Sequence, residues 1–521
     1  EAAIVTFLFL FGAFLEQRTL TKTRLAIKEL TEMAPESALK LMEDGEFVEV
    51  KIDEVAVGDI LLVKTGAKVP VDGTVLAGEG YVNEASITGE SLPVGKEKGA
   101  NVYAGTILEN GTLQIVADRV GEDTTFSRII ELVEEAQDAK SKAERFIDRF
   151  AKYYTPAVLV LAFTVWLFSQ NIELAITILV LGCPGALVIG VPVANVAGIG
   201  NGARHGVLFK GSEVIDDFSK VDTIVFDKTG TLTMGKPKVT EREFLTEGPE
   251  GIAEVLAYLA SVEKESDHPL ATAVVDFVEE IGERKRYPVE KTEVIKGAGV
   301  VAQVNGRRVA VGNTALMERE NVPLDEKARA AITRCKASGK SLVLTAVDGE
   351  LKVLLGIGDQ IRPGVKEDLQ RLKRLGVKNL VVLSGDNQGT VDLVARELGL
   401  TEAHGNMLPR DKAVYVEELI AQGHTVAFVG DGVNDSPSLA RAQIGIAMGG
   451  GTDVAIETSD VVLMNSDFRR LPHALGLAKA TAGNMRQNIL IAVGVVLALL
   501  ASLLFSEWMN MSIGMLVHEA S

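Results

Sequence analysis

Cysteine is nearly absent from this chain, with only Cys183 and Cys335 among 521 residues. Two thiols so far apart in sequence give no disulfide framework, so we expect the large domains to face a reducing cytosol. Positive charge is also scarce, with 53 lysines and arginines against 71 aspartates and glutamates and a formal net charge of −18. Since nucleic-acid binding needs basic patches against the phosphate backbone, we expect no nucleic-acid partner.

The chain also lacks an initiator methionine and a readable signal peptide, because it opens at Glu1 inside an apolar run and ends at Ser521 in another. We interpret it as a fragment that lacks membrane helices at both ends. Hydrophobic residues make up 47% and charged residues 24% of the chain, and the mean hydropathy is +0.20. These values predict a few apolar helices attached to large aqueous domains.

Long apolar runs place the expected membrane helices. Crossing a bilayer takes roughly 20 apolar residues. Residues 2–15 look like the end of one such helix, residues 153–169 and 173–200 predict a hairpin with a short outer loop, residues 488–505 predict a further span, and residues 509–521 begin another. The alternative to a membrane hairpin is a buried hairpin in a soluble core. The uninterrupted apolar length of the segments argues against this alternative.

The remaining sequence predicts two kinds of aqueous domain. From about Val48 to Asp123, short β-branched runs separated by Gly and Asp indicate a small β domain. Residues 205–480 alternate apolar strands with helical segments, a pattern typical of a parallel sheet covered on both faces. The stretch from Met234 to about Leu354 has strands and helices of its own, so we interpret it as an inserted domain.

The strongest chemical signal is DKTGTLT, which runs from Asp227 to Thr233 directly after the apolar strand VDTIVF. A carboxylate at the carboxyl end of a parallel strand sits where open α/β sheets bind ligands. There it can attack the γ-phosphate of ATP and form an acyl phosphate. The glycine and threonines that follow would let backbone N–H groups approach the phosphoryl oxygens. A lone strand-ending Asp is usually structural, but the whole heptapeptide favours the nucleophile.

Three later segments supply what phosphoryl transfer needs. SGD, with Ser384 and Asp386, offers a hydroxyl to a phosphoryl oxygen, and Lys412 in PRDK offers a fixed positive charge. GDGVND places Asp431 and Asp435 near the same strand end. Phosphoryl transfer requires Mg²⁺. We expect Asp227, Asp431 and the carbonyl of Thr229 to bind this ion, with Asp435 in support.

Together with TGES at residues 88–91 and CPG at residues 183–185, these segments resemble the P-type ATPases, and more narrowly their heavy-metal-transporting branch, over essentially the whole chain. The resemblance implies a haloacid-dehalogenase-like α/β phosphorylation domain in which Asp227 accepts the phosphoryl group, next to Lys228 and Thr229. It also implies a β-rich actuator domain whose Glu90, after Thr88 and Gly89, positions the water that hydrolyses the phosphoenzyme.

The same resemblance assigns the rest of the aqueous sequence. The inserted α+β domain would bind the nucleotide, and five residues match the adenine-site motifs of the heavy-metal branch: Glu263, His268, Gly297, Gly299 and Gly312. The implied division is a membrane helix at 1–22, the actuator domain with flanking helices at 23–135, a membrane hairpin at 136–204, the phosphorylation domain at 205–235 and 355–480, the nucleotide-binding domain at 236–354 and membrane helices at 484–521.

The transport site is expected where Pro184 breaks a spanning helix and frees backbone carbonyls, with Cys183 beside it as a soft ligand. Position 185 is Gly, whereas the commonest heavy-metal motif is Cys-Pro-Cys, and the loss of one thiolate weakens a copper(I) assignment. His518 and Glu519 add an imidazole and a carboxylate inside an apolar run, where ionisable groups are costly and usually functional.

Two further positions bear on the choice of metal. By resemblance to zinc and cadmium pumps, Glu1 would fall on the acidic position where ions enter the membrane. Those pumps also carry a lysine in the helix after the catalytic core, and Val496 stands at the matching position. The missing lysine weakens a simple zinc/cadmium assignment.

The sequence therefore predicts an ATP-driven exporter of a divalent heavy-metal cation, with Zn²⁺ or Cd²⁺ favoured and Co²⁺ or Fe²⁺ possible. We expect a monomer in the cell membrane, with its large domains in the cytoplasm. A copper or potassium pump, a soluble haloacid-dehalogenase-like phosphatase and a metal-sensing membrane protein without turnover are the alternatives.

Overall fold

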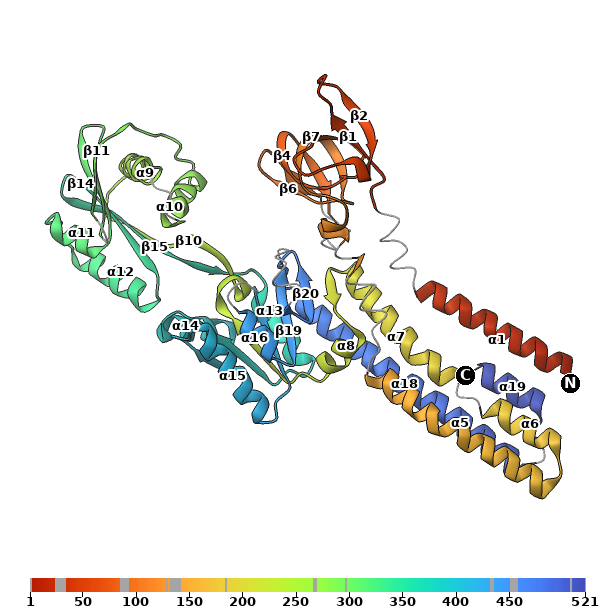
Figure 1. Ribbon diagram of the computed structural model, residues 1–521. Helices are drawn as coiled ribbons and strands as arrows, with labels where there is room; N and C mark the ends of the chain where they lie inside the picture. The colour runs from red at the N-terminus through yellow and green to blue at the C-terminus, as the bar shows by residue number, and fades with distance from the viewer. Residues whose placement is uncertain are drawn as a thin grey trace.

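The computed structural model describes residues 2–23, 34–84, 93–127, 130–131, 142–182, 185–265, 269–295, 298–431, 435–449, 458–506 and 508–520. Long helices gather at one end of an elongated molecule together with both chain termini, and three folded units lie at the other end (Figure 1). This separation agrees with the expectation of a few apolar helices attached to large aqueous domains.

The first unit is an antiparallel sheet of seven strands in the order β2-β1-β3-β7-β4-β5, with β6 paired to β4. Alternate side chains of β3 and β7, such as Leu61 and Ile115, point into one apolar core. The strands are β1 (Ser37–Leu41), β2 (Phe47–Lys51), β3 (Ile60–Lys64), β4 (Asp72–Asn83), β5 (Val94–Lys96), β6 (Asn101–Val102) and β7 (Ile107–Arg119). The predicted β-rich domain is confirmed.

The second unit is a seven-stranded sheet in the order β17-β16-β9-β18-β19-β20-β8, parallel except for the edge strand β8. Ile224 and Phe226 of β9 enter one apolar cluster and Val225 enters another. Both faces are therefore buried, as the continuous apolar strands predicted. The strands are β8 (Val207–Phe209), β9 (Thr223–Asp227), β16 (Asn379–Leu383), β17 (Glu402–His404), β18 (Val426–Gly430), β19 (Ile444–Gly449) and β20 (Val461–Met464).

Helices cover both faces of this sheet. Leu369 of α13 and Val391 of α14 pack into the first cluster, whereas Val416 of α15 and Leu439 of α16 pack into the second. The helices are α8 (Ser212–Ser219), α13 (Val365–Arg374), α14 (Gln388–Leu398), α15 (Pro409–Ala421) and α16 (Ser436–Arg441).

The third unit is inserted between β9 and β16 and consists of an antiparallel sheet in the order β10-β15-β14-β13-β12-β11 with helices on it. Its elements are β10 (Thr233–Phe244), α9 (Pro249–Glu263), α10 (Pro269–Glu280), β11 (Val289–Ile295), β12 (Gly299–Val304), β13 (Arg307–Gly312), α11 (Thr314–Arg319), α12 (Glu326–Ala337), β14 (Ser341–Val347) and β15 (Glu350–Ile361). The paired strands β10 and β15 run through the expected boundaries at 235 and 355, so the place where the two domains divide stays a prediction.

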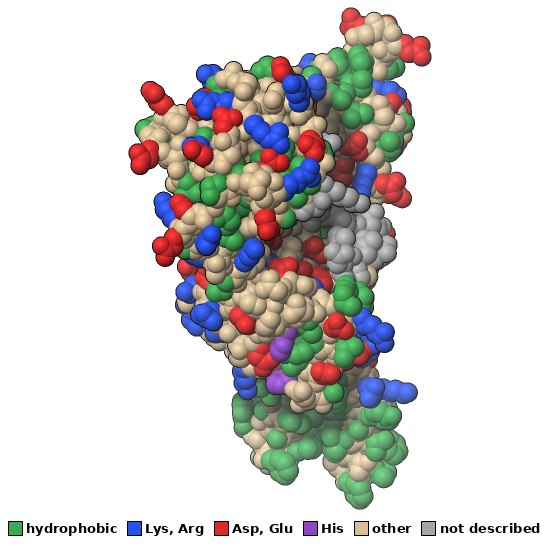
Figure 2. All heavy atoms as spheres, turned by 90° about the vertical axis from the view of Figure 1, so that its left-hand side faces the viewer, with side chains coloured by type: hydrophobic (Ala, Val, Ile, Leu, Met, Phe, Trp, Pro, Cys, Tyr) green, Lys and Arg blue, Asp and Glu red, His purple; other side chains and the backbone are tan. Residues whose placement is uncertain are grey.

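Three described stretches are long and apolar enough to cross a membrane: Lys142–Ser169, Ile172–Arg204, which includes the undescribed residues 183–184, and Arg470–Phe505. The helices of this end are α1 (Ala2–Thr23), α5 (Lys142–Ser169), α6 (Ile172–Leu181), α7 (Gly185–Arg204), α18 (Arg470–Phe505) and α19 (Met511–Ala520). Hydrophobic side chains cover this end of the molecule, whereas charged side chains are mixed over the rest (Figure 2). The predicted fold class is confirmed.

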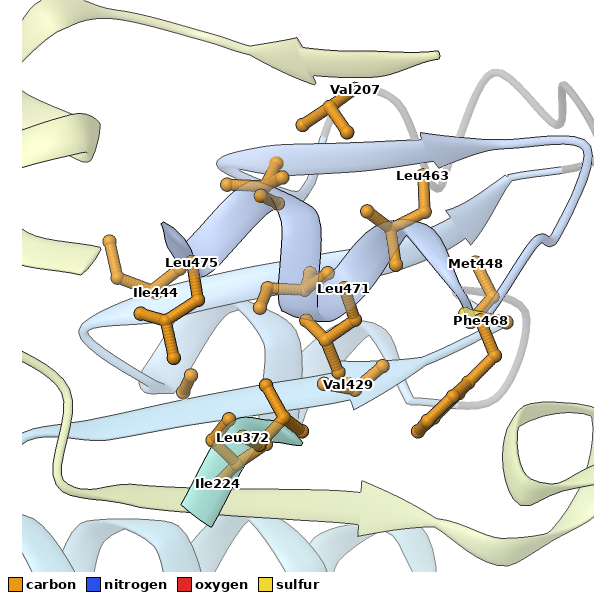
Figure 3. Close-up of a cluster of buried hydrophobic side chains, with 14 of the residues drawn as sticks. Val207, Ile224, Leu372, Val429, Ile444, Met448, Leu463, Phe468, Leu471 and Leu475 are labelled. Atoms are coloured by element: carbon orange, nitrogen blue, oxygen red, sulfur yellow. The ribbon is translucent and has the colours of Figure 1, made fainter. Parts of the chain in front are cut away.

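Helix α18 joins the membrane end to the parallel sheet. Its 36 residues correspond to a length of roughly 54 Å at 1.5 Å per residue. In its first turns Leu471 and Leu475 are fully buried against strand residues such as Ile444 and Leu463 (Figure 3). Farther along, Leu490 and Leu497 are exposed to the surroundings of the helix. One rigid element therefore connects the core of the sheet to the membrane.

Candidate functional site

Asp227 is the last residue of β9 and lies between two parallel neighbours, β16 and β18. All five residues of β9 are buried, and Asp227 itself is 7% exposed. Ser384 follows β16 and Asp431 follows β18. Because the carboxyl ends of parallel strands meet at one edge of a sheet, all three residues lie at the same edge, where α/β sheets bind ligands.

Lys412 lies in the first turn of α15 and reaches this edge from outside the sheet. Its Nζ donates to Oδ1 of Asp227 at 2.7 Å and to Oδ1 of Asp435 at 3.1 Å. The three side chains are almost completely buried, with at most 10% exposed. Since buried charges are tolerated mainly when they are paired, this arrangement makes Lys412 the cation that balances two carboxylates.

The shared burial shifts the protonation of these groups. Burial raises the pKa of Asp227 to about 7, the neighbouring Asp435 carboxylate adds to the rise, and Lys412 opposes it. Burial alone would lower the pKa of Lys412, but the two carboxylates outweigh it and raise that pKa above its ordinary value. A carboxyl group that titrates near neutral pH beside a permanent cation is typical of a reactive site.

The turn after Asp227 is fixed to the SGD segment. Lys228 is nearly buried, and its Nζ lies 2.8 Å from Oδ2 of Asp386. The backbone N–H of Asp386 donates to Oγ of Ser384 at 3.1 Å. Thr229 is exposed, and Gly230 has φ +77°, a left-handed conformation that glycine adopts without strain. The sequence-predicted residues of DKTGT and SGD are thus brought together in one place.

Asp359 and Arg362, which the sequence analysis missed, hold the same turn from the end of β15. The guanidinium of Arg362 donates to the carbonyls of Gly230 at 2.7 Å, Thr233 at 3.0 Å and Ser466 at 2.9 Å. Asp359 accepts from the hydroxyl of Thr233 and, at 2.9 Å, from the backbone N–H of Gly235. The signal that could have revealed them is GDQIRPG, where two charged residues end a strand that returns to the DKTGT turn.

At the membrane end, His518 and Glu519 lie in α19, with Nδ1 of His518 4.0 Å from Oε1 of Glu519. A Cβ built on Gly185, the first residue of α7, would lie 3.9 Å from Cε1 of His518. His518 therefore approaches the end of the CPG motif. Cys183, Pro184 and Glu1 lie outside the described residues. Val496 is 8% exposed in α18 and provides no charge there.

Comparison with known proteins matches two parts of the chain to families: residues 32–134 to the P-type ATPase actuator domain and residues 221–443 to the haloacid dehalogenase-like hydrolases. A cadmium-transporting ATPase of Staphylococcus aureus is 36% identical over 99% of this chain and 72% of its own length. A copper-exporting P-type ATPase of Legionella pneumophila is 40% identical over 94% of this chain and 67% of its own length. The chain belongs to the P-type ATPases.

Solved structures agree with this assignment. A zinc-transporting PIB-type ATPase in its E2.Pi state is 35% identical and superposes with a TM-score of 0.64. The match covers 100% of this chain and 85% of that one. The relatives carry cadmium, copper or zinc in their names, so this P-type ATPase lies in the heavy-metal-transporting branch and is an ATPase of a membrane, as the sequence predicted. The relatives do not decide between the metals.

The Mg²⁺ expected for a P-type ATPase fits the residues at the sheet edge. A Cβ on Gly230 would lie 3.4 Å from Oδ2 of Asp431, so glycine keeps the space between this carboxylate and the turn open. Oδ2 of the buried Asp435 has no hydrogen-bond partner among the described residues. Among the described residues, no group of three or more His, Cys, Asp or Glu side chains is arranged to hold a metal ion by itself. Mg²⁺ usually binds one or two carboxylates together with substrate phosphates, which matches this donor set.

Three of the five residues expected to bind the nucleotide lie within the described part of the chain. Gly299 and Gly312 are directly opposed on β12 and β13. A Cβ on either would meet the facing backbone, so both strands need glycine here. Glu263 ends α9, and burial raises its pKa to about 7. A cleft of about 730 Å³ runs from Lys228 and Asp386 past Lys340 to Leu270. His268 and Gly297 lie outside the described residues.

The TGES motif, with Thr88, Gly89 and Glu90, also lies outside the described residues. Described residues on either side of it form an ion pair: Nζ of Lys96, the last residue of β5, lies 2.7 Å from Oε1 of Glu84, which follows β4, and both side chains are at most 10% exposed. The role of Glu90 stays a prediction.

Proposed function

We propose that this chain exports a divalent heavy-metal ion, Zn²⁺ or Cd²⁺ before Co²⁺ or Fe²⁺, and that ATP drives the export by phosphorylating Asp227. The observation that carries the choice of metal is the approach of His518, which lies beside Glu519, to Gly185 of the CPG segment. Imidazole, carboxylate and a cysteine thiolate together form a donor set suited to a borderline divalent ion. Copper(I) favours sulfur ligands, so a copper exporter is the second candidate.

In the first half of the cycle, the Asp227 carboxylate attacks the γ-phosphorus of ATP. The bond from that phosphorus to the β,γ-bridging oxygen breaks, and ADP leaves with the electron pair. Lys412 balances the charge that develops, and Lys228, Ser384 and Asp386 orient the transferred group. Asp227, Asp431 and the Thr229 carbonyl, with Asp435 in support, would hold Mg²⁺, which would supply positive charge to the phosphate oxygens.

In the second half, water attacks the phosphorus of the acyl phosphate and Glu90 takes up its proton. Inorganic phosphate leaves and the Asp227 carboxylate is restored. The nucleotide itself lies against Glu263, His268, Gly297, Gly299 and Gly312. Within this proposal the domains divide at the positions predicted from the sequence, the pump acts as a monomer in the cell membrane, and its large domains lie in the cytoplasm.

The test uses the full-length protein and radioactive ATP with Zn²⁺, Cd²⁺, Co²⁺, Fe²⁺ or Cu⁺. We expect an acid-stable, hydroxylamine-sensitive label with Zn²⁺ or Cd²⁺, its loss in Asp227→Asn, and weaker metal dependence in Cys183→Ala. The exposed Asp392→Asn on α14 is the matched control. Metal-dependent ATP hydrolysis by Asp227→Asn would disprove the mechanism, and a response to Cu⁺ alone would replace the divalent ion by copper.

A further inference from the structure

Gly12 lies in α1 where this helix passes Glu519 of α19. A methyl group built on Gly12 would overlap Oε2 and the carboxyl carbon of Glu519 and would lie 3.1 Å from Oε1. Gly12 itself is buried. Any larger residue at this position must displace the carboxylate. The present position of Glu519 therefore depends on the fact that residue 12, in a different helix, has no side chain.

The carboxylate held there belongs to the candidate ion site. Oε1 of Glu519 lies 4.0 Å from Nδ1 of His518, and the His518 ring approaches Gly185 at the start of α7. Helix α1 packs against both α19 and α7. Three helices therefore meet around the His518–Glu519 pair. Two of them face the pair with glycine, and at Gly12 the Glu519 carboxylate occupies the space that a side chain would fill.

Other glycines of the membrane helices have different surroundings. A Cβ on Gly494 of α18 would meet nothing within 4 Å. A Cβ on Gly514 of α19 would crowd the side chain of Leu181, with Cδ2 at 2.9 Å, which is an apolar helix-packing contact. An alanine at Gly494 therefore tests the effect of an added methyl group alone, and an alanine at Gly514 tests the effect of disturbed helix packing. Neither contacts the Glu519 carboxylate.

We propose that Gly12 is a positioning residue of the transport site. The space that it leaves keeps the Glu519 carboxylate beside His518 and thereby sets the affinity for the transported divalent cation. This inference rests on the proposed function. Zinc-type ions bind carboxylate oxygens at about 2.0–2.2 Å, and a functional site tolerates a misplacement of only about 0.5 Å. A methyl group on Gly12 would move the carboxylate farther than that.

The first measurement is the Zn²⁺ concentration that gives half-maximal phosphorylation of the full-length protein by ATP. We expect Gly12→Ala to raise it about 10- to 100-fold, while Gly494→Ala leaves it unchanged and Gly514→Ala changes it less than threefold. Phosphorylation by inorganic phosphate in the presence of Mg²⁺ but without Zn²⁺, the reverse of hydrolysis, should be as strong in Gly12→Ala as in wild type. That readout reports a folded catalytic half that never needs the ion site.

The second measurement is a rescue. Glu519→Asp shortens the side chain by one methylene group and makes room for the new methyl group. We expect the double variant Gly12→Ala/Glu519→Asp to bind Zn²⁺ at least threefold better than the two single effects combined would give. Three results would overturn the proposed role of Gly12. They are an equal loss of Zn²⁺ affinity in Gly514→Ala, no rescue in the double variant, and loss of phosphorylation by inorganic phosphate in Gly12→Ala. If the wild-type protein shows no metal-dependent phosphorylation, the proposed function is overturned as well. If the wild type is phosphorylated in a metal-dependent way and Gly12→Ala behaves like it, only the role of Gly12 is overturned.

Discussion

At the end of β9, the buried carboxylates of Asp227 and Asp435 share the ammonium group of Lys412, whereas in α19 the carboxylate of Glu519 pairs with no lysine or arginine within the described part of the chain. The candidate catalytic site thus contains its own balancing charge, the Lys412 ammonium group. Under the proposed function, the charge of Glu519 is balanced by His518 and by the transported cation.

Lys412→Met tests the first half of this comparison most severely. Two buried carboxylates would lose their only direct cation in the described structure, and we expect phosphorylation by ATP to fall about 1000-fold, as when a main stabilising donor is removed. Stability should fall by about 3 kcal/mol because buried charges are left unpaired. Quenched-flow phosphorylation and thermal unfolding measure both effects. The exposed Lys366→Met on α13 is the control, and a variant that phosphorylates normally would show that Lys412 is structural.

Glu519→Gln tests the second half. The substitution keeps the size of the side chain and removes its charge, so we expect the Zn²⁺ concentration for half-maximal phosphorylation to rise about 100-fold. Phosphorylation by inorganic phosphate should not change, since it involves only the catalytic site. The exposed Glu173→Gln at the start of α6 is the matched control. If both variants behave alike, Glu519 is not a ligand and the contrast between the two sites fails.

The two sites also differ in how far the sequence predicted them. Residues that follow consecutive parallel strands must meet at one sheet edge, so the meeting of Asp227, Ser384 and Asp431 follows from strand order. Gly12 and Glu519 lie on separate helices more than 500 residues apart in the chain, and no periodicity says which helix faces which. The hold of Arg362 on the turn was missed for the same reason, because it depends on where the returning strand β15 ends.

Arg362→Lys sharpens the comparison by asking how much rigidity the catalytic site needs. Lysine keeps the charge but cannot donate to three carbonyls in fixed directions, so the turn after Asp227 should become looser. We expect phosphorylation by ATP to slow about tenfold, with metal affinity unchanged. The exposed Arg371→Lys on α13 is the control. A change in metal affinity without a change in phosphorylation rate would contradict this role and would link Arg362 to the membrane half.

The smallest effect is expected at Glu263 at the end of α9, for which the described residues give no ion pair. Burial raises the pKa of this carboxyl group to about 7, so it loses its proton as the pH rises from 6 to 8. An ionised carboxylate accepts a hydrogen bond from the exocyclic amine of adenine more strongly than the neutral acid does. We therefore expect the affinity for ATP to rise about threefold over that interval, measured by calorimetry on the Asp227→Asn protein so that no phosphate is transferred.

Glu263→Gln should bind ATP as the neutral acid does and show no such rise, whereas Glu265→Gln, two residues farther along the chain, should keep it. An affinity that falls with pH would mean that the ionised carboxylate repels the phosphates, and would place Glu263 beside them instead of beside the base.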